Sequence, residues 1–121
     1  MSSKTILVVD DDPDILFFCT SLLGSHGYVV KTANSGASGL EAARTEKPDL
    51  IILDIMMEKI NTGYAIAEEL GREFPILMFS SMLNPSDATF DPEKVPYRDV
   101  VSKPIAGAIL LEKVRGIIGE S

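Results

Sequence analysis

The sequence predicts an α/β domain with a doubly wound parallel sheet, and two features of its hydrophobic pattern support this fold class. Short apolar runs recur along the chain without alternating polar residues, which is typical of strands covered on both faces. Segments with apolar residues at helical spacing separate these runs, so that strand and helix alternate five times. Because parallel strands need crossovers of helix length, this alternation favours a parallel sheet with right-handed connections.

The first two expected elements are a strand and the helix that follows it. The unbroken apolar run at residues 6–9 predicts the strand. The helix is predicted by apolar residues at helical spacing, namely Ile15, Phe18, Cys19, Leu22 and Leu23. Asp12 fits the N-cap of this helix, Pro13 fits its first position, and Gly27 is expected to end it.

The next elements are a weaker strand at residues 28–33 and a helix at about residues 37–44. Asn34 or Ser35 is available to cap this helix, and Pro48 lies beyond its end. Apolar runs at residues 50–53, at 76–79 and, more briefly, at 100–101 predict the remaining strands.

Two further helices are expected in the second half of the chain. One is suggested by Tyr64, Ala67, Glu68 and Leu70. The other spans residues 105–118 and closes the domain. Its spacing predicts that one set of apolar side chains faces the core, namely Ile109, Leu110, Val114, Ile117 and Ile118.

The charge and cysteine content exclude several classes of protein. Eighteen acidic and eleven basic residues give a net charge of −7, which argues against electrostatic binding of nucleic acid or of an anionic membrane. Cys19 is the only cysteine, so neither an internal disulfide nor a cysteine-based zinc cluster can form. No apolar run reaches the roughly 18 residues that a spanning helix needs. We therefore expect one soluble, cytoplasmic domain over residues 1–121.

Polar residues follow the carboxyl ends of the expected strands, where ligands bind in doubly wound sheets. They are Asp10-Asp11-Asp12, Asp54, Ser80-Ser81 and Ser102-Lys103-Pro104. Each group alone is common in caps and turns. Together, however, carboxylates at one edge repel one another unless a cation neutralises them, and a divalent ion does so most simply.

The same residue types suit phosphoryl transfer. Mg²⁺ binds carboxylates, a carbonyl, waters and a phosphate oxygen in octahedral geometry. A metal, a lysine such as Lys103 and a hydroxyl around a nucleophilic carboxylate are sufficient to position a phosphoryl group and neutralise its charge. Asp54 stands alone at a central strand end and is the natural nucleophile, whereas Asp10 and Asp11 suit metal binding. Asp12 is expected to cap the first helix instead of binding metal.

These residues, in this order, resemble the receiver domain of two-component response regulators over essentially the whole chain. The resemblance rests on four motifs, which are Ile-Leu-Val-Val-Asp10-Asp11-Asp12-Pro13, Asp49-Leu-Ile-Ile-Leu-Asp54, Pro75-Ile-Leu-Met-Phe-Ser80-Ser81 and Val101-Ser-Lys103-Pro104. The family implies a flavodoxin-like, five-stranded parallel sheet with strand order 2-1-3-4-5.

The resemblance also implies a role for each site residue. Asp54 is then the phosphoacceptor, with a sensor histidine kinase or a histidine phosphotransfer protein as the donor. Asp11 binds Mg²⁺ directly, Asp10 does so largely through water, and the Met56 backbone carbonyl completes the protein's share of the coordination sphere. Ser80 is the switch hydroxyl and Lys103 pairs with the phosphoryl oxygens. Ser81 and the Pro104 that follows Lys103 are auxiliary.

Two segments depart from the family pattern. Receivers usually carry Met-Pro soon after the phosphoacceptor, whereas Glu58 stands in the place of the proline, and Gly63 lies one position later than the family's glycine. The family's helix between its fourth and fifth strands falls at residues 84–97. Pro85, Pro92 and Pro96 interrupt that segment, so we expect a shortened or irregular helix there.

The function implied is that of a response regulator receiver, which switches interactions with partner proteins. Such a receiver is not an enzyme with a separate substrate, but it assists its own phosphorylation and dephosphorylation. One alternative is a receiver-like interaction module that works without phosphate. Another is a phosphohydrolase of the haloacid-dehalogenase type, which needs an acidic pair after its lysine, where only Glu112 and Glu120 follow here. A flavin carrier is disfavoured because the acidic loop at residues 10–14 would repel its phosphate. The kinase, the output partner and the oligomeric state are not specified by the sequence.

Overall fold

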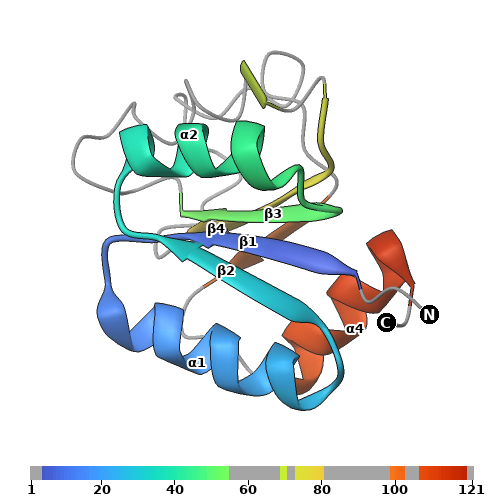
Figure 1. The fold of residues 1–121 in the computed structure, drawn as a ribbon. Helices are drawn as coiled ribbons and strands as arrows, with labels where there is room; N and C mark the ends of the chain where they lie inside the picture. The colour runs from blue at the N-terminus through green and yellow to red at the C-terminus, as the bar shows by residue number, and fades with distance from the viewer. Residues whose placement is uncertain (1–3, 55–68, 71–72, 81–98, 103–106, 120–121) are drawn as a thin grey trace, which may run out of the picture.

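The computed structural model contains a five-stranded parallel sheet with strand order β2-β1-β3-β4-β5 (Figure 1). The structure describes residues 4–54, 69–70, 73–80, 99–102 and 107–119. The strands are β1 (Thr5–Val9), β2 (Val29–Ala33), β3 (Leu50–Asp54), β4 (Ile76–Ser80) and β5 (Asp99–Ser102). The fold class, the parallel sheet and the strand order are therefore confirmed.

In the described part of the chain, helices cover both faces of the sheet (Figure 1). Helices α1 (Pro13–Ser25) and α4 (Gly107–Ile118) lie on one face, and α2 (Gly36–Glu46) lies on the other. Glu69 and Leu70 are also helical, and Leu70 packs with the α2 side of the core. The rest of the helix expected near residues 64–70 lies outside the described residues, as do residues 105–106, the lengthened segment that ends at Gly63 and the proline-containing segment at 84–97.

The helix starts follow the local sequence signals. Asp12 caps α1, because its side chain accepts a hydrogen bond of 2.9 Å from the backbone N–H of Asp14. Of the two caps considered for α2, Ser35 is the one observed, with a bond of 3.2 Å from the N–H of Ser38. Gly27 adopts a φ of 93°, which glycine allows and which ends the run of α1.

The two strands with unbroken apolar runs, β1 and β3, are more buried than the weaker strand β2. Every residue of β3 is buried, and in β1 only Thr5 is not, whereas β2 is a mostly exposed edge strand. The core has two parts, one on each face of the sheet. The α2 side is lined by small helix residues such as Ala43, and the α1/α4 side by larger ones such as Leu23 and Leu110.

One prediction about the last helix is wrong in part. Ile109 was placed on the core face, but it is 49% exposed, and Leu111 is buried in its place. The buried α4 residues are Leu110, Leu111 and Val114, and the predicted Ile117 and Ile118 also pack against this core, partly buried. Because each helical residue turns by about 100°, position 109 falls beyond the edge of this buried stripe.

Hydrogen bonds join elements at the amino ends of the strands. The Thr5 N–H donates to the Asp49 carboxylate at 2.8 Å, and the Asp49 N–H donates to the Thr5 carbonyl at 2.7 Å. Just before the neighbouring strand β2, the Tyr28 hydroxyl donates to the carbonyl of Gly119, just beyond α4, at 2.8 Å. At the amino ends of the strands, these hydrogen bonds thus connect β1 with the residue before β3, and the residue before β2 with the residue after α4.

Candidate functional site

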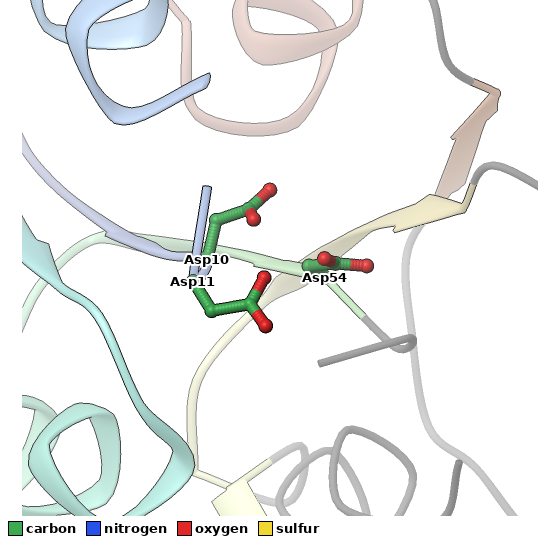
Figure 2. A group of neighbouring side chains, drawn as sticks. All are labelled: Asp10, Asp11 and Asp54. Atoms are coloured by element: carbon green, nitrogen blue, oxygen red, sulfur yellow. The ribbon is translucent and has the colours of Figure 1, made fainter. Parts of the chain in front are cut away.

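Three aspartates meet at the carboxyl ends of β1 and β3 (Figure 2). Asp10 directly follows β1, and Asp54 is the last residue of β3. Because Val9 pairs with Leu53, these two acids lie side by side across the strand pair. Asp10 and Asp11 extend toward Asp54, and each of the three offers a carboxylate oxygen within 4.8 Å of the others. The predicted convergence of the two motifs is therefore observed in the geometry.

The cluster combines two buried acids with an exposed one. Asp10 is fully buried and Asp54 is 3% exposed, whereas Asp11 is open to solvent. Buried carboxylates close to one another are costly when ionised unless positive charge or hydrogen bonds compensate them. A cation held by this cluster would supply such positive charge.

The backbone after β1 fixes Asp10 in place. Its N–H donates to the carbonyl of Ala33 at 3.1 Å, which continues the β1–β2 ladder by one step. One of its carboxylate oxygens accepts a hydrogen bond of 2.9 Å from the N–H of Asp12. The carboxylate of Asp12 itself caps α1 and is not part of the cluster. The expectation that Asp12 has a structural role is therefore confirmed.

The chemistry of these donors fits a hard divalent cation. Carboxylate oxygens are the ligands that Mg²⁺ and Ca²⁺ prefer, and Mg²⁺ keeps several waters when only a few protein ligands are present. Within the described part of the chain, Asp10, Asp11 and Asp54 are the only group of three or more His, Cys, Asp or Glu residues close enough to share an ion. No metal-ligating group was therefore missed there by the sequence reasoning.

The remaining predicted site residues are described only in part. Ser80 ends β4 and pairs with Ser102 of β5, so both backbones reach the carboxyl edge where Asp54 lies. Met56, Ser81, Lys103 and Pro104 lie outside the described residues, and their expected roles stay predictions.

The comparison with protein families decides what kind of domain this is. A model of the response regulator receiver domain matches residues 6–115, which is most of the chain. The chain belongs to this family. It is a receiver domain of the response regulator type, and the acidic cluster lies inside the matched region.

Relatives of known sequence include both short and long response regulators. The receiver is 29% identical to the protein PilH of Pseudomonas aeruginosa, over 93% of this chain and 96% of PilH. It is 35% identical to the alkaline phosphatase synthesis transcriptional regulatory protein PhoP of Bacillus subtilis, over 98% of this chain but 50% of PhoP. The chain thus spans about half the length of such transcriptional regulators.

Solved structures of receivers have the same fold. A receiver domain protein described as CheY-like, from Methanospirillum hungatei, is 26% identical and superposes with a TM-score of 0.85, over 95% of this chain and 93% of that one. The chemotaxis protein CheY4 of Vibrio cholerae is 25% identical, with a TM-score of 0.86 over 96% and 99% of the two chains. None of the helices within the described ranges has the length and apolar character needed to cross a bilayer.

Proposed function

We propose that Asp54 of this receiver accepts a phosphoryl group from a phosphohistidine, on a sensor histidine kinase or a histidine phosphotransfer protein, in a Mg²⁺-dependent reaction. The observation that carries the proposal is the position of Asp54. It is a buried carboxylate at the end of the central strand, and its oxygen lies within 4.8 Å of those of two further aspartates.

Asp10, Asp11 and Asp54 would hold the ion, together with the backbone carbonyl of Met56. Bound Mg²⁺ supplies positive charge that neutralises the phosphoryl oxygens as the transfer proceeds. Asp10 is fixed by the N–H of Asp12 and lies deepest, which suits a ligand that acts largely through water. Asp11 is exposed at the open side and suits direct coordination.

The transfer itself needs little beyond alignment. A carboxylate oxygen of Asp54 attacks the phosphorus in line, the bond from phosphorus to the histidine nitrogen breaks, and that nitrogen leaves with the electron pair. The product is an acyl phosphate on Asp54. Lys103 would pair with the phosphoryl oxygens and Ser80 would donate its hydroxyl to one of them, as the family resemblance implies. Loss of the phosphoryl group to water would use the same residues.

Phosphorylation would act by changing which proteins the receiver binds. A phosphoryl group adds charge and strong acceptor oxygens at the carboxyl edge of β3, next to β4 and β5. Ser80 is the last residue of β4, and Lys103 directly follows β5. New contacts of these two residues with the phosphoryl group would therefore change the protein surface near these strands. The partner that reads this surface is not assigned.

Intact-protein mass spectrometry after incubation with acetyl phosphate tests the proposal. The wild-type chain is expected to gain one phosphoryl group with Mg²⁺ and none without it, and Asp54→Ala is expected to gain none. Asp49→Asn is the matched control, because Asp49 precedes the same strand at its opposite end and lies outside the cluster. A folded wild-type chain that stays unmodified would refute the proposal and favour the phosphate-independent interaction module. An Asp54→Ala chain that is modified as fully as the wild type would refute Asp54 as the acceptor.

A further inference from the structure

We propose that Gly39 is a positioning residue for the cation site, because its lack of a side chain lets α2 pack onto Val9 and so holds Asp10 in the acidic cluster. This inference rests on the proposed function, since it concerns the same Mg²⁺ site. It adds a residue on α2 that contributes no ligand atom and that the sequence reasoning did not single out.

The contact between α2 and β1 at this point leaves no room for a methyl group. A Cβ atom built on Gly39 would lie 2.7 Å and 2.9 Å from the two methyl carbons of Val9, and 3.4 Å from its Cβ. Both methyl groups face the glycine, so turning the valine side chain cannot free the space. Val9 is fully buried among the residues of the α2 side of the core, so any movement disturbs its neighbours. An alanine at position 39 must therefore displace the helix or the end of the strand.

The end of the strand is the support of Asp10. Val9 is the last residue of β1 and the direct neighbour of Asp10 in the chain. Val9 pairs with Ala33 on one side and with Leu53, the residue before Asp54, on the other. A displacement of Val9 therefore moves Asp10 relative to Asp54.

A second connection runs through β2. The Asp10 N–H donates to the carbonyl of Ala33, and Ala33 is linked to α2 through only Asn34 and the N-cap residue Ser35. The position of α2 thus affects the position of Asp10 through two contacts, one by way of Val9 and one by way of Ala33. Buried groups that support metal ligands are known to control metal affinity strongly.

Three glycines in the other two helices do not share this contact. A Cβ on Gly107 would meet Leu22 at an ordinary 3.5 Å, and one on Gly24 or Gly116 would have nothing within 4 Å. Gly116 is therefore a matched control, since it lies inside α4 and is exposed. A glycine-to-alanine change there tests the substitution without the contact.

Titration of the ¹⁵N-labelled chain with Mg²⁺, followed by backbone amide shifts, gives the dissociation constant without any phosphorylation. Gly39→Ala is expected to weaken Mg²⁺ binding on the order of ten-fold, whereas Gly116→Ala keeps the wild-type value. Adding Val9→Ala to Gly39→Ala removes the two methyl groups that the new Cβ would meet. The double variant is therefore expected to recover the affinity of Val9→Ala alone, which a general loss of stability would not predict.

The outcomes separate this inference from the proposed function. A wild-type chain that shows no Mg²⁺-dependent shifts at Asp10, Asp11 and Asp54 overturns both. Wild-type binding with an unchanged constant in Gly39→Ala, or a double variant as weak as Gly39→Ala, overturns the role of Gly39 alone. If Gly39→Ala does not fold, Val9→Ile enlarges the same contact from the strand side by one methylene, and an unchanged affinity in that variant overturns the role equally.

Discussion

Polar residues have different roles at the two ends of the parallel strands, and β3 shows both roles. At its carboxyl end, Asp54 lies beside Asp10 and Asp11, so that like charges are gathered. Just before its amino end, Asp49 accepts a hydrogen bond from the Thr5 backbone and returns one from its own N–H. The same residue type is thus gathered with like charges at one end of the strand and paired with the backbone at the other.

This difference is what a binding site built on a sheet requires. The carboxylates at the carboxyl ends of the strands repel one another. A bound cation reduces this repulsion, so this site favours positive charge. No such preference arises from Thr5, Asp49 and Tyr28 at the amino ends, since these polar groups are already paired within the chain. Removal of a carboxylate should therefore lower the free energy of unfolding at the amino ends of the strands and raise it at the carboxyl ends. Only the change at the carboxyl ends should alter the response to Mg²⁺.

The largest effect is expected at the amino edge. Asp49→Ala removes the carboxylate that accepts from the Thr5 N–H, and the free energy of unfolding should fall by about 1.5 kcal/mol, the usual value for a hydrogen bond to a charged group. Urea unfolding followed by circular dichroism measures this, with and without Mg²⁺. The loss should be the same in both conditions, because Asp49 is not part of the cluster.

Asp49→Asn serves as the control for that experiment. It keeps an oxygen acceptor without the charge, so its loss should be about 0.5 kcal/mol. An Asp49→Ala variant as stable as the wild type would show that the paired edge contributes nothing to stability, and the contrast between the edges would be lost.

A smaller effect, with the opposite sign, is expected at the carboxyl edge. Mg²⁺ at ten times its dissociation constant should raise the free energy of unfolding of the wild type by about 1.4 kcal/mol, since it binds only the folded chain. Asp11→Asn should be more stable than the wild type without Mg²⁺, by a few tenths to about 1 kcal/mol, because one repelling charge is gone. It should also lose most of the gain from Mg²⁺.

The same urea titrations, run at several Mg²⁺ concentrations, measure both quantities. Sodium at equal ionic strength is the control for screening. If Asp11→Asn gains as much from Mg²⁺ as the wild type does, Asp11 is not a ligand and the ion lies elsewhere.

A third effect, smaller than the loss in Asp49→Ala, concerns Tyr28. Tyr28→Phe removes the hydroxyl that donates to the Gly119 carbonyl but keeps the ring in the core, so a loss of about 1 kcal/mol is expected. The change should leave the response to Mg²⁺ intact, because this bond lies at the edge opposite the cluster. Altered Mg²⁺ affinity in this variant would mean that the two edges are coupled.

Features determined by neighbouring residues could be predicted from the sequence. The caps Asp12 and Ser35 act on residues two and three positions ahead, so their signal is local. The positions of β1 and β3 could be predicted from their unbroken apolar runs, because a strand covered on both faces does not alternate apolar and polar residues. The meeting of Asp10 with Asp54 followed from the parallel direction of these strands, which brings their carboxyl ends to one edge.

Features determined by how elements pack could not be predicted in this way. Whether Ile109 or Leu111 is buried depends on which side of α4 meets the sheet, and both choices are compatible with the helical spacing. The bond from Tyr28 to Gly119 joins residues 91 positions apart, and the Gly39 contact depends on the distance between α2 and β1. Neither of these contacts has a signature in the local sequence.

Identification of the phosphorylated residue tests the central claim most directly. The chain is phosphorylated with acetyl phosphate and Mg²⁺ and then treated with borohydride, which reduces an acyl phosphate to an alcohol and so converts a phosphorylated aspartate to homoserine. Peptide sequencing by tandem mass spectrometry then locates the homoserine. Homoserine is expected at position 54 and nowhere else, and only when Mg²⁺ was present. Homoserine at position 10 or 11, or its formation without Mg²⁺, would contradict the assignment of Asp54 as acceptor in a cation-dependent site.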